Sequence, residues 1–271
     1  PLFLPKGIEI TVTMIILSNV ISELTSILVL FFFLPKNIVY KKKDFYIRKG
    51  YIKDALDISI PTTLSRLIGS IGYFLEPIIL TTTLKHIGYT SSFIINQYGI
   101  LQGYVMPLVL LPSFFTLAIS QALLPVIAKA ISDKRITYTK KKIKQAIFFS
   151  LLIGIPATIL FIILPKLFLN IMYHTNQGST YLQVLAPICL FQYIQSPLAF
   201  SLDAMGRSKD NLKATIIGTI IRTITLFLFS LLKIGLYGYI ISTSIHVIFT
   251  TFYNYYQVKK YLTFFTTFSQ K

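Results

Sequence analysis

The chain has 271 residues, of which 54% are hydrophobic and only 13% carry a formal charge. Soluble domains carry about 25% charged residues, so this composition excludes an ordinary soluble globular protein. The net charge of +17 would also suit a nucleic-acid-binding protein. However, the Lys and Arg residues stand in short segments between long apolar runs, which is the pattern of a membrane protein.

Seven apolar runs are long enough to cross a bilayer, whose hydrocarbon core takes about 20 helical residues. In chain order, the predicted spans are Ile8–Leu34, Ala55–Leu84, Phe93–Ile127, Ala146–Leu169, Tyr181–Met205, Ala214–Leu232 and Tyr239–Tyr256. The sequence therefore predicts an all-α membrane protein with about seven transmembrane helices. Because the chain begins with Pro1 and not with methionine, we expect it to be a fragment of a longer protein.

The basic residues sort onto alternate connections between these spans. One side holds about 20 of the 26 Lys and Arg residues. The other side holds only Lys6, Lys85, Lys166 and Lys233. Cytoplasmic loops carry the excess of Lys and Arg in membrane proteins. We therefore predict a multi-pass protein of the bacterial cell membrane whose C-terminus is cytoplasmic, and we expect its basic loops to contact anionic phospholipid headgroups.

Proline residues interrupt the predicted spans. Each removes a backbone hydrogen bond that hydrocarbon cannot replace, and helices broken in this way line the pathways of many transporters. These prolines are Pro61, Pro77, Pro107, Pro112, Pro125, Pro156, Pro187 and Pro197. The pattern favours a transporter over a simple membrane anchor.

Two arginines fall inside predicted spans, Arg66 in the second and Arg222 in the sixth. An arginine within the bilayer is costly, so it usually faces a cavity or a partner. Since guanidinium groups bind phosphate well, we predict that Arg66, Arg222 and the nearby Glu76 form a substrate-binding site. The alternative interpretation for each arginine is structural, either as part of an ion pair or with its side chain extended to the membrane surface. For Arg66 the partner would be Asp57 or Glu76.

Further acidic residues lie in or near the spans, and these carboxylates are candidates for binding a proton or Na⁺ during coupled transport. The candidates are Glu23, Asp57 and Asp203. His246 in the last span is expected to be a packed polar residue, with a proton relay as the alternative.

Catalytic and metal-binding motifs do not occur in the sequence. HExxH, CxxC, GxSxG and the glycine loop of nucleotide-binding proteins are all missing, and the three histidines are far apart. We therefore expect no catalytic site, no bound metal, no cofactor, no nucleic-acid partner and no enzyme activity.

Three stretches resemble a known family of transporters. They are DISIPTTLSRLIGS at residues 57–70 with FLEP at residues 74–77, the segment from Tyr98 to Phe114, and AISQALLP at residues 118–125. These residues are similar to the polysaccharide-exporter branch of the multidrug/oligosaccharidyl-lipid/polysaccharide flippase superfamily.

The resemblance implies a fold of two six-helix lobes joined by a cytoplasmic loop. Residues 1–34 would then contain the last helix of the first lobe, residues 35–54 the basic connector, residues 55–257 the second lobe and residues 258–271 a cytoplasmic tail. The rest of the first lobe would be a missing partner of this chain.

By the same resemblance, the protein is expected to flip a lipid-linked oligosaccharide or peptidoglycan precursor during cell-wall or spore-cortex synthesis. Arg66 is the residue best placed to contact the pyrophosphate of such a substrate. Two alternatives remain open: a cation-coupled multidrug exporter of the same superfamily, and a membrane scaffold for cell-wall enzymes that transports nothing.

Overall fold

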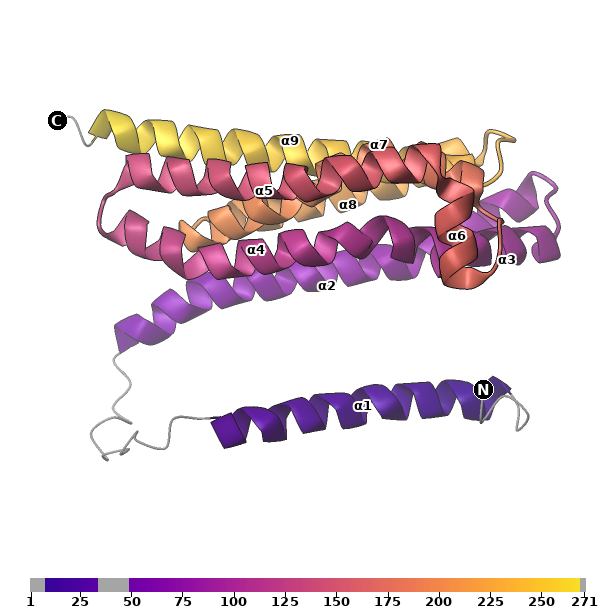
Figure 1. Cartoon of the computed structure of the whole chain (residues 1–271), viewed down its shortest axis with the longest axis horizontal. Coiled ribbons are helices and arrows are strands. Elements are labelled where there is room, and N and C mark those ends of the chain that lie inside the picture. Colours follow the sequence, from indigo (N-terminus) through magenta and orange to yellow (C-terminus); the bar gives the residue numbers. More distant parts are fainter. Residues whose placement is uncertain (1–7, 34–48, 269–271) are drawn as a thin grey trace. The chain divides into compact units, whose positions relative to one another are not determined.

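The computed structural model describes residues 8–33 and 49–268, which form helices joined by short turns (Figure 1). The chain divides into two compact units, residues 1–52 and residues 53–271. In the first unit, α1 (Ile8–Phe33) is an apolar helix of 26 residues. No strand occurs among the described residues, so the predicted all-α fold is confirmed for that part of the chain.

The second unit contains the helices that build the rest of the described fold. They are α2 (Lys49–His86), α3 (Ser91–Ile100), the π-helical η3 (Leu101–Val105), α4 (Met106–Ser132), α5 (Ile136–Ile163), α6 (Pro165–Tyr173), α7 (Ser179–Ala204), α8 (Ser208–Ser230) and α9 (Tyr237–Phe268). Residues 49–54, which the sequence assigned to the connector, are the first turns of α2. Residues 35–48, the rest of the expected connector, lie outside the described residues.

Five stretches of the described chain are long and apolar enough to cross a membrane: Ala55–His86, Ser91–Ser132, Ile136–Ile163, Ser179–Ala204 and Ser208–Ser230. The apolar part of α1 is shorter, Ile16–Val29. The helix α9 is not among these five stretches, but residues of its 32 belong to both buried clusters of the second unit. The protein is therefore a multi-pass membrane protein, and its helices fit the predicted count of about seven.

The predicted C-terminal end of the fourth span, Ala146–Leu169, is wrong. The helix α5 stops at Ile163, and α6 starts separately at Pro165. Proline lacks the backbone N–H that would continue the hydrogen bonds of α5, and it fits well in the first turn of a new helix. At the other end of α6, His174 adopts a left-handed conformation with φ of 52°.

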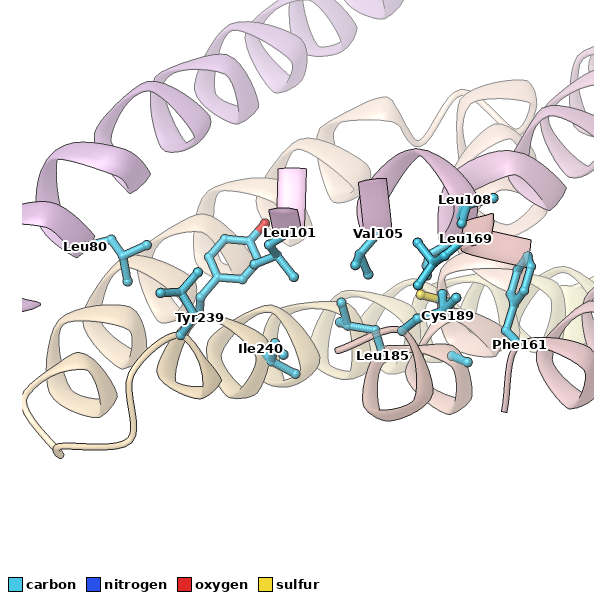
Figure 2. Packing of buried hydrophobic residues seen from close by; sticks show 14 of the residues in the cluster. Leu80, Leu101, Val105, Leu108, Phe161, Leu169, Leu185, Cys189, Tyr239 and Ile240 are labelled. Atoms are coloured by element: carbon cyan, nitrogen blue, oxygen red, sulfur yellow. The ribbon is translucent and has the colours of Figure 1, made fainter. Parts of the chain in front are cut away.

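The core of the second unit surrounds α7, which packs against α4, α5 and α9. Its buried side chains include Leu185 and Cys189, which lie close to Val105 and Leu108 of the neighbouring helices (Figure 2). The fully buried Tyr193 donates a hydrogen bond from its hydroxyl to the carbonyl oxygen of Val109 at 2.7 Å. Large apolar side chains also cover the outside of the helices, for example Phe114 at 69% exposure, as expected where lipid is the solvent.

One end of the second unit, which we call the basic end, holds the turn between α4 and α5 and the turn between α7 and α8. Arg207 beside the second turn lies over the ring of Tyr261, near the end of α9, at 5.5 Å from its centroid. Lys209 forms an ion pair of 3.6 Å with Asp57, near the start of α2. The described Lys and Arg residues are concentrated here, and the opposite end carries Lys85, Lys166 and Lys233.

Candidate intramembrane polar site

A buried ion pair joins α2 to α8 within the membrane-spanning part of the second unit. The Arg222 guanidinium donates through Nη2 to Oε2 of Glu76. Arg222 is 7% exposed and Glu76 is 2% exposed. Burying a charge is tolerated only when it is paired and hydrogen-bonded. Glu76 and Arg222 each provide the counter-charge for the other.

Hydrogen bonds from three further side chains complete the site. Tyr98 and Gln102 both donate to Oε1 of Glu76, at 3.2 and 3.0 Å. Gln102 also bonds through Nε2 to the hydroxyl of Tyr239 at 3.0 Å. The same hydroxyl lies 3.4 Å from Arg222 Nη2. We call these residues the polar cluster: Glu76, Tyr98, Gln102, Arg222 and Tyr239.

Aromatic rings enclose the guanidinium group of Arg222. Its central carbon lies 4.7 Å from the ring centroid of Tyr73 and 5.7 Å from that of Tyr239. A cation over an aromatic face is attracted by the ring's quadrupole, more strongly where water is excluded. Figure 2 shows the Tyr239 ring among apolar core residues, with Leu80 and Leu101 on either side of it. The polar cluster is therefore surrounded by apolar side chains.

The local sequence explains how Tyr98 and Gln102 reach Glu76. The two residues are four apart, a spacing that places them on one helix face, and Gln102 belongs to the π-helical segment η3. Single π-helical turns are often found at functional sites. Pro107 follows closely, and it lacks the N–H that would bond to the carbonyl of Gly103. The irregular backbone thus lies where the polar side chains gather.

A small cavity of about 140 Å³ opens beside Arg222. Polar residues from α7, α8 and α9 line it, namely Gln192, Gln195, Arg222, Thr243 and His246. Among the described residues, Arg222 Nε and Gln195 Oε1 are buried without a hydrogen-bond partner. Buried polar atoms are usually satisfied by protein or by water, so this cavity has the size and the unpaired groups needed to hold water or a small polar group.

The structural pairing considered for Arg66 is wrong. Glu76 pairs with Arg222, and Asp57 pairs with Lys209. The reason is the rise of a helix, about 1.5 Å per residue, which places Arg66 about 15 Å from Glu76 along α2. Arg66 itself is exposed and interacts electrostatically with Asp203, close to the end of α7.

Asp57 and Asp203, the other predicted acidic residues of the second unit, do not join the polar cluster. Asp203 lies 3.5 Å from the side-chain amide of Asn211. Asp57 is exposed near the basic end. Glu23 is exposed on α1, in the separate first unit. Within the described residues, no group of three His, Cys, Asp or Glu side chains is arranged to hold a metal ion.

Sequence reasoning selected Glu76 and Arg222 but missed Gln102, Tyr239 and Tyr73 as their partners. Glutamine and tyrosine residues are common in membrane spans, so the residue type alone does not indicate a functional site. Gln102 has one usable clue, because it stands between Gly99 and Gly103 shortly before Pro107, where a regular helix is weakened.

Two protein-family models match the chain. The model described as "Polysaccharide biosynthesis protein" matches residues 2–131, and the MatE model matches residues 70–228, which is more than half of the chain. Both matches agree with the superfamily that the sequence stretches resemble.

Two characterised proteins of Bacillus subtilis (strain 168) are similar in sequence. Stage V sporulation protein B is 33% identical over 238 residues, covering 83% of this chain and 45% of that protein. Sporulation protein YkvU is 30% identical over 162 residues, covering 60% of this chain and 36% of that protein. The chain thus spans less than half the length of these relatives.

Solved structures of MATE proteins share the fold. MATE in the straight conformation superposes with a TM-score of 0.75 at 16% identity, over 93% of this chain and 55% of that chain. The outward-facing conformation of a multidrug resistance MATE family transporter of the MOP superfamily gives 0.70 at 15% identity, over 83% of this chain and 50% of that chain.

Proposed function

The chain belongs to the MatE family, and we propose that it supplies the second lobe of a two-lobe transporter that flips a lipid-linked sugar across the bacterial cell membrane. Residues 1–34 would belong to the first lobe, residues 35–54 to the connector, residues 55–257 to the second lobe and residues 258–271 to the tail. The basic end and the C-terminus would face the cytoplasm. The rest of the first lobe would be the partner.

The half-length match supports a lobe rather than a whole transporter. The chain covers 45% of stage V sporulation protein B and 55% of a MATE structure, while most of its own length is matched in both. Transporters of this kind bind their substrates between repeated halves. The substrate pathway would accordingly run along a face of this unit and not through its centre.

The exposed Arg66 is the observation that favours an anionic substrate. It stands on a surface of α2 whose neighbouring side chains Leu64 and Leu67 are also exposed and apolar. Such a cation in a membrane-spanning helix needs water, a headgroup or an anionic ligand. The pyrophosphate that joins a sugar to its lipid carrier would provide that ligand, because guanidinium groups bind phosphate oxygens in pairs.

Arg222 would take part in a different way. Its charge is neutralised by Glu76, so the pair as it stands attracts no anion. Protonation of Glu76, or competition by a phosphate group, would release the guanidinium for the substrate. The polar cluster would then couple the state of Glu76 to substrate binding, as expected of a transporter that uses an ion gradient.

A cationic substrate, as expected for a multidrug exporter, receives less support. Exporters of cations need acidic side chains without counter-charges near the pathway. Glu76 is paired with Arg222, and Asp203 interacts with Arg66 and Asn211. Glu76 is therefore not left to attract a cationic drug, and Asp203 lies near the positive charge of Arg66.

Replacement of Arg66 tests the proposal. In the complete two-lobe transporter reconstituted in vesicles, Arg66→Ala should slow the flipping of a pyrophosphate-linked sugar by about tenfold or more, since one charged hydrogen-bonding partner is lost. Arg66→Lys should retain part of the rate because it keeps the charge but loses the paired geometry.

Arg135→Ala is the matched control, because Arg135 is an exposed arginine in the turn between α4 and α5. It removes the same charge and should leave the rate within about twofold of the wild type, as expected of an exposed charge away from the pathway. Equal rates for Arg66→Ala and wild type would remove Arg66 from the mechanism. Faster transport of a cationic dye than of the lipid-linked sugar would favour the multidrug exporter.

A further inference from the structure

A groove of about 340 Å³ lies at the basic end, between α5, α7 and α9. Its walls are partly apolar, since Ile143, Leu198, Val258 and Leu262 belong to one buried cluster and also line the groove. It is separate from the polar cluster, which involves none of these residues. Nothing in the proposed transport function requires it.

The two long walls of the groove have the same residue spacing. On α5 the lining residues are Lys140, Ile143, Lys144 and Ile147. On α9 they include Tyr255, Val258, Lys259 and Leu262, with Thr263 after them. In both helices, the first four of these positions follow the pattern i, i+3, i+4 and i+7, which forms one continuous helix face. Two faces of mixed apolar and basic character therefore oppose each other across the groove.

The charge of the groove has one sign. Lys140, Lys144 and Lys259 line it, and none of the lining residues in the described part of the chain is acidic. Lys144 and Lys259 are exposed, and Lys140 is half-buried. A cavity with three ammonium groups and no carboxylate in its walls attracts an anion.

We propose that this groove is a binding site for an anionic phospholipid. The three lysines would hold the phosphate of the headgroup, and one acyl chain would follow the apolar wall formed by Ile147 and Leu198 toward the middle of the membrane. Basic pockets between helices on the cytoplasmic side of a membrane bind acidic headgroups in this way. A soluble anion would use the lysines but would leave the apolar wall uncovered.

Tyr255 places the groove at the depth of the membrane surface. It lines the groove and is 50% exposed, and tyrosine is enriched where the hydrocarbon meets the headgroups. Lys140 and Lys144 lie nearer the start of α5 than Ile147 does, and Lys259 lies nearer the end of α9 than Tyr255 does. Ile147 therefore continues the groove from the lysines toward the middle of the membrane.

A tryptophan introduced into the groove gives a direct measurement, because the chain contains no Trp. We would introduce Tyr255→Trp and reconstitute the protein in phosphatidylcholine vesicles containing brominated phosphatidylglycerol, which quenches tryptophan on contact. Quenching should show a preference for brominated phosphatidylglycerol over brominated phosphatidylcholine of about tenfold or more, because lysines near the membrane surface attract anionic headgroups. Tyr256→Trp is the control, since Tyr256 is exposed but does not line the groove. It should show a preference below about twofold, as a bulk lipid contact does.

Charge variants then test the lysines. In the Tyr255→Trp protein, Lys140→Gln, Lys144→Gln and Lys259→Gln together should abolish the preference. Lys141→Gln, Lys142→Gln and Lys260→Gln together remove the same charge from the same two helices outside the groove. This control set should keep the preference, which shows that position in the groove matters and net charge does not.

Three results would overturn the proposal. The first is equal quenching of the Tyr255→Trp protein by both brominated lipids, and the second is an equal effect of the two sets of lysine variants. The third is an introduced tryptophan in the groove that neither lipid quenches, because a protein segment would then cover the groove. All three readouts come from the folded protein in a bilayer, so a transport defect cannot produce them.

Discussion

The helices α2 and α7 both contain two prolines, yet different interactions hold them in the second unit. The helix α7 is central and packs on α4, α5 and α9 through apolar side chains and the buried Tyr193. The helix α2 instead has an exposed side over much of its length, and polar contacts attach it to α8. The helix α7 is held mainly by close packing, whereas α2 combines the apolar packing of Leu80 and Leu84 with a buried ion pair.

This difference has a physical consequence. Close packing of apolar groups is non-directional and resists any displacement of the helix. An ion pair within the membrane depends on two groups and on their protonation, so it can be broken by a proton or by a competing anion. We therefore expect α2 to be the helix whose position responds to a ligand, and α7 to be the fixed reference against which it moves.

The largest expected effect is that of Glu76→Gln. It removes the counter-charge from the buried Arg222, so the free energy of unfolding should fall by about 3–5 kcal/mol. Unfolding in detergent, followed by circular dichroism, measures the loss. The double variant Glu76→Gln with Arg222→Gln removes both charges and should recover most of the stability. If the single variant is as stable as the wild type, the pair does not hold α2 in place.

A smaller effect is expected in the closely packed region from Gly154→Ala on α5. The added Cβ would lie 2.5 Å from Cδ2 of Tyr193, whose ring is fully buried and whose hydroxyl is bonded to Val109. The ring has no room to move, so the free energy of unfolding should fall by about 1–3 kcal/mol.

Gly69→Ala on α2 is the matched control in the loosely packed region. Nothing lies within 4 Å of the Cβ position there, so stability should stay the same or rise slightly, since alanine favours a helix over glycine. The same unfolding measurement compares both variants. Equal losses at the two positions would contradict the difference in packing between α2 and α7.

The smallest effect is expected from Asp57→Asn at the basic end. Asp57 and Lys209 are 3.6 Å apart, but their side chains are 54% and 71% exposed. Exposed ion pairs contribute about 0–1 kcal/mol and are screened by salt. The change in unfolding free energy should stay below about 0.5 kcal/mol and vanish at high salt. A loss as large as that of Glu76→Gln would mean that the basic end, and not the polar cluster, anchors α2.

The predicted spans and the end of α5 show which features of the fold can be predicted from local sequence. Long apolar runs predicted where the helices lie, because each span must satisfy its own backbone hydrogen bonds within hydrocarbon. The break at Pro165 was missed because apolar residues resume after Lys166 and continue to Leu169. Hydropathy indicates whether a segment prefers lipid to water, and it does not indicate where a helix ends. Here α5 ends because Pro165 lacks the backbone N–H that would continue its hydrogen bonds.

The candidate site shows which features local sequence cannot predict. Glu76 and Arg222 were selected because a charge within a span is expensive wherever the helix lies. Their pairing was not predicted, since 146 residues separate them. The alternative pairing of Arg66 with Asp57 or Glu76 relied on closeness in sequence, but about 15 Å of helix separates Arg66 from Glu76. Tyr239 had no signal in the sequence, and Gln102 had only its place between Gly99 and Gly103, because a neutral polar side chain becomes part of a site only through its neighbours.

The sequence by itself determined that this chain crosses the membrane several times, that its basic residues gather at one end, and which charges lie within the membrane. Each of these follows from the transfer of single residues or single helices between water and lipid. The tertiary structure alone decided that Glu76 meets Arg222, that Gln102 and two tyrosines surround them, and that lysines of α5 and α9 share one groove. These depend on which helix faces which, and that choice arises from packing among all the helices together.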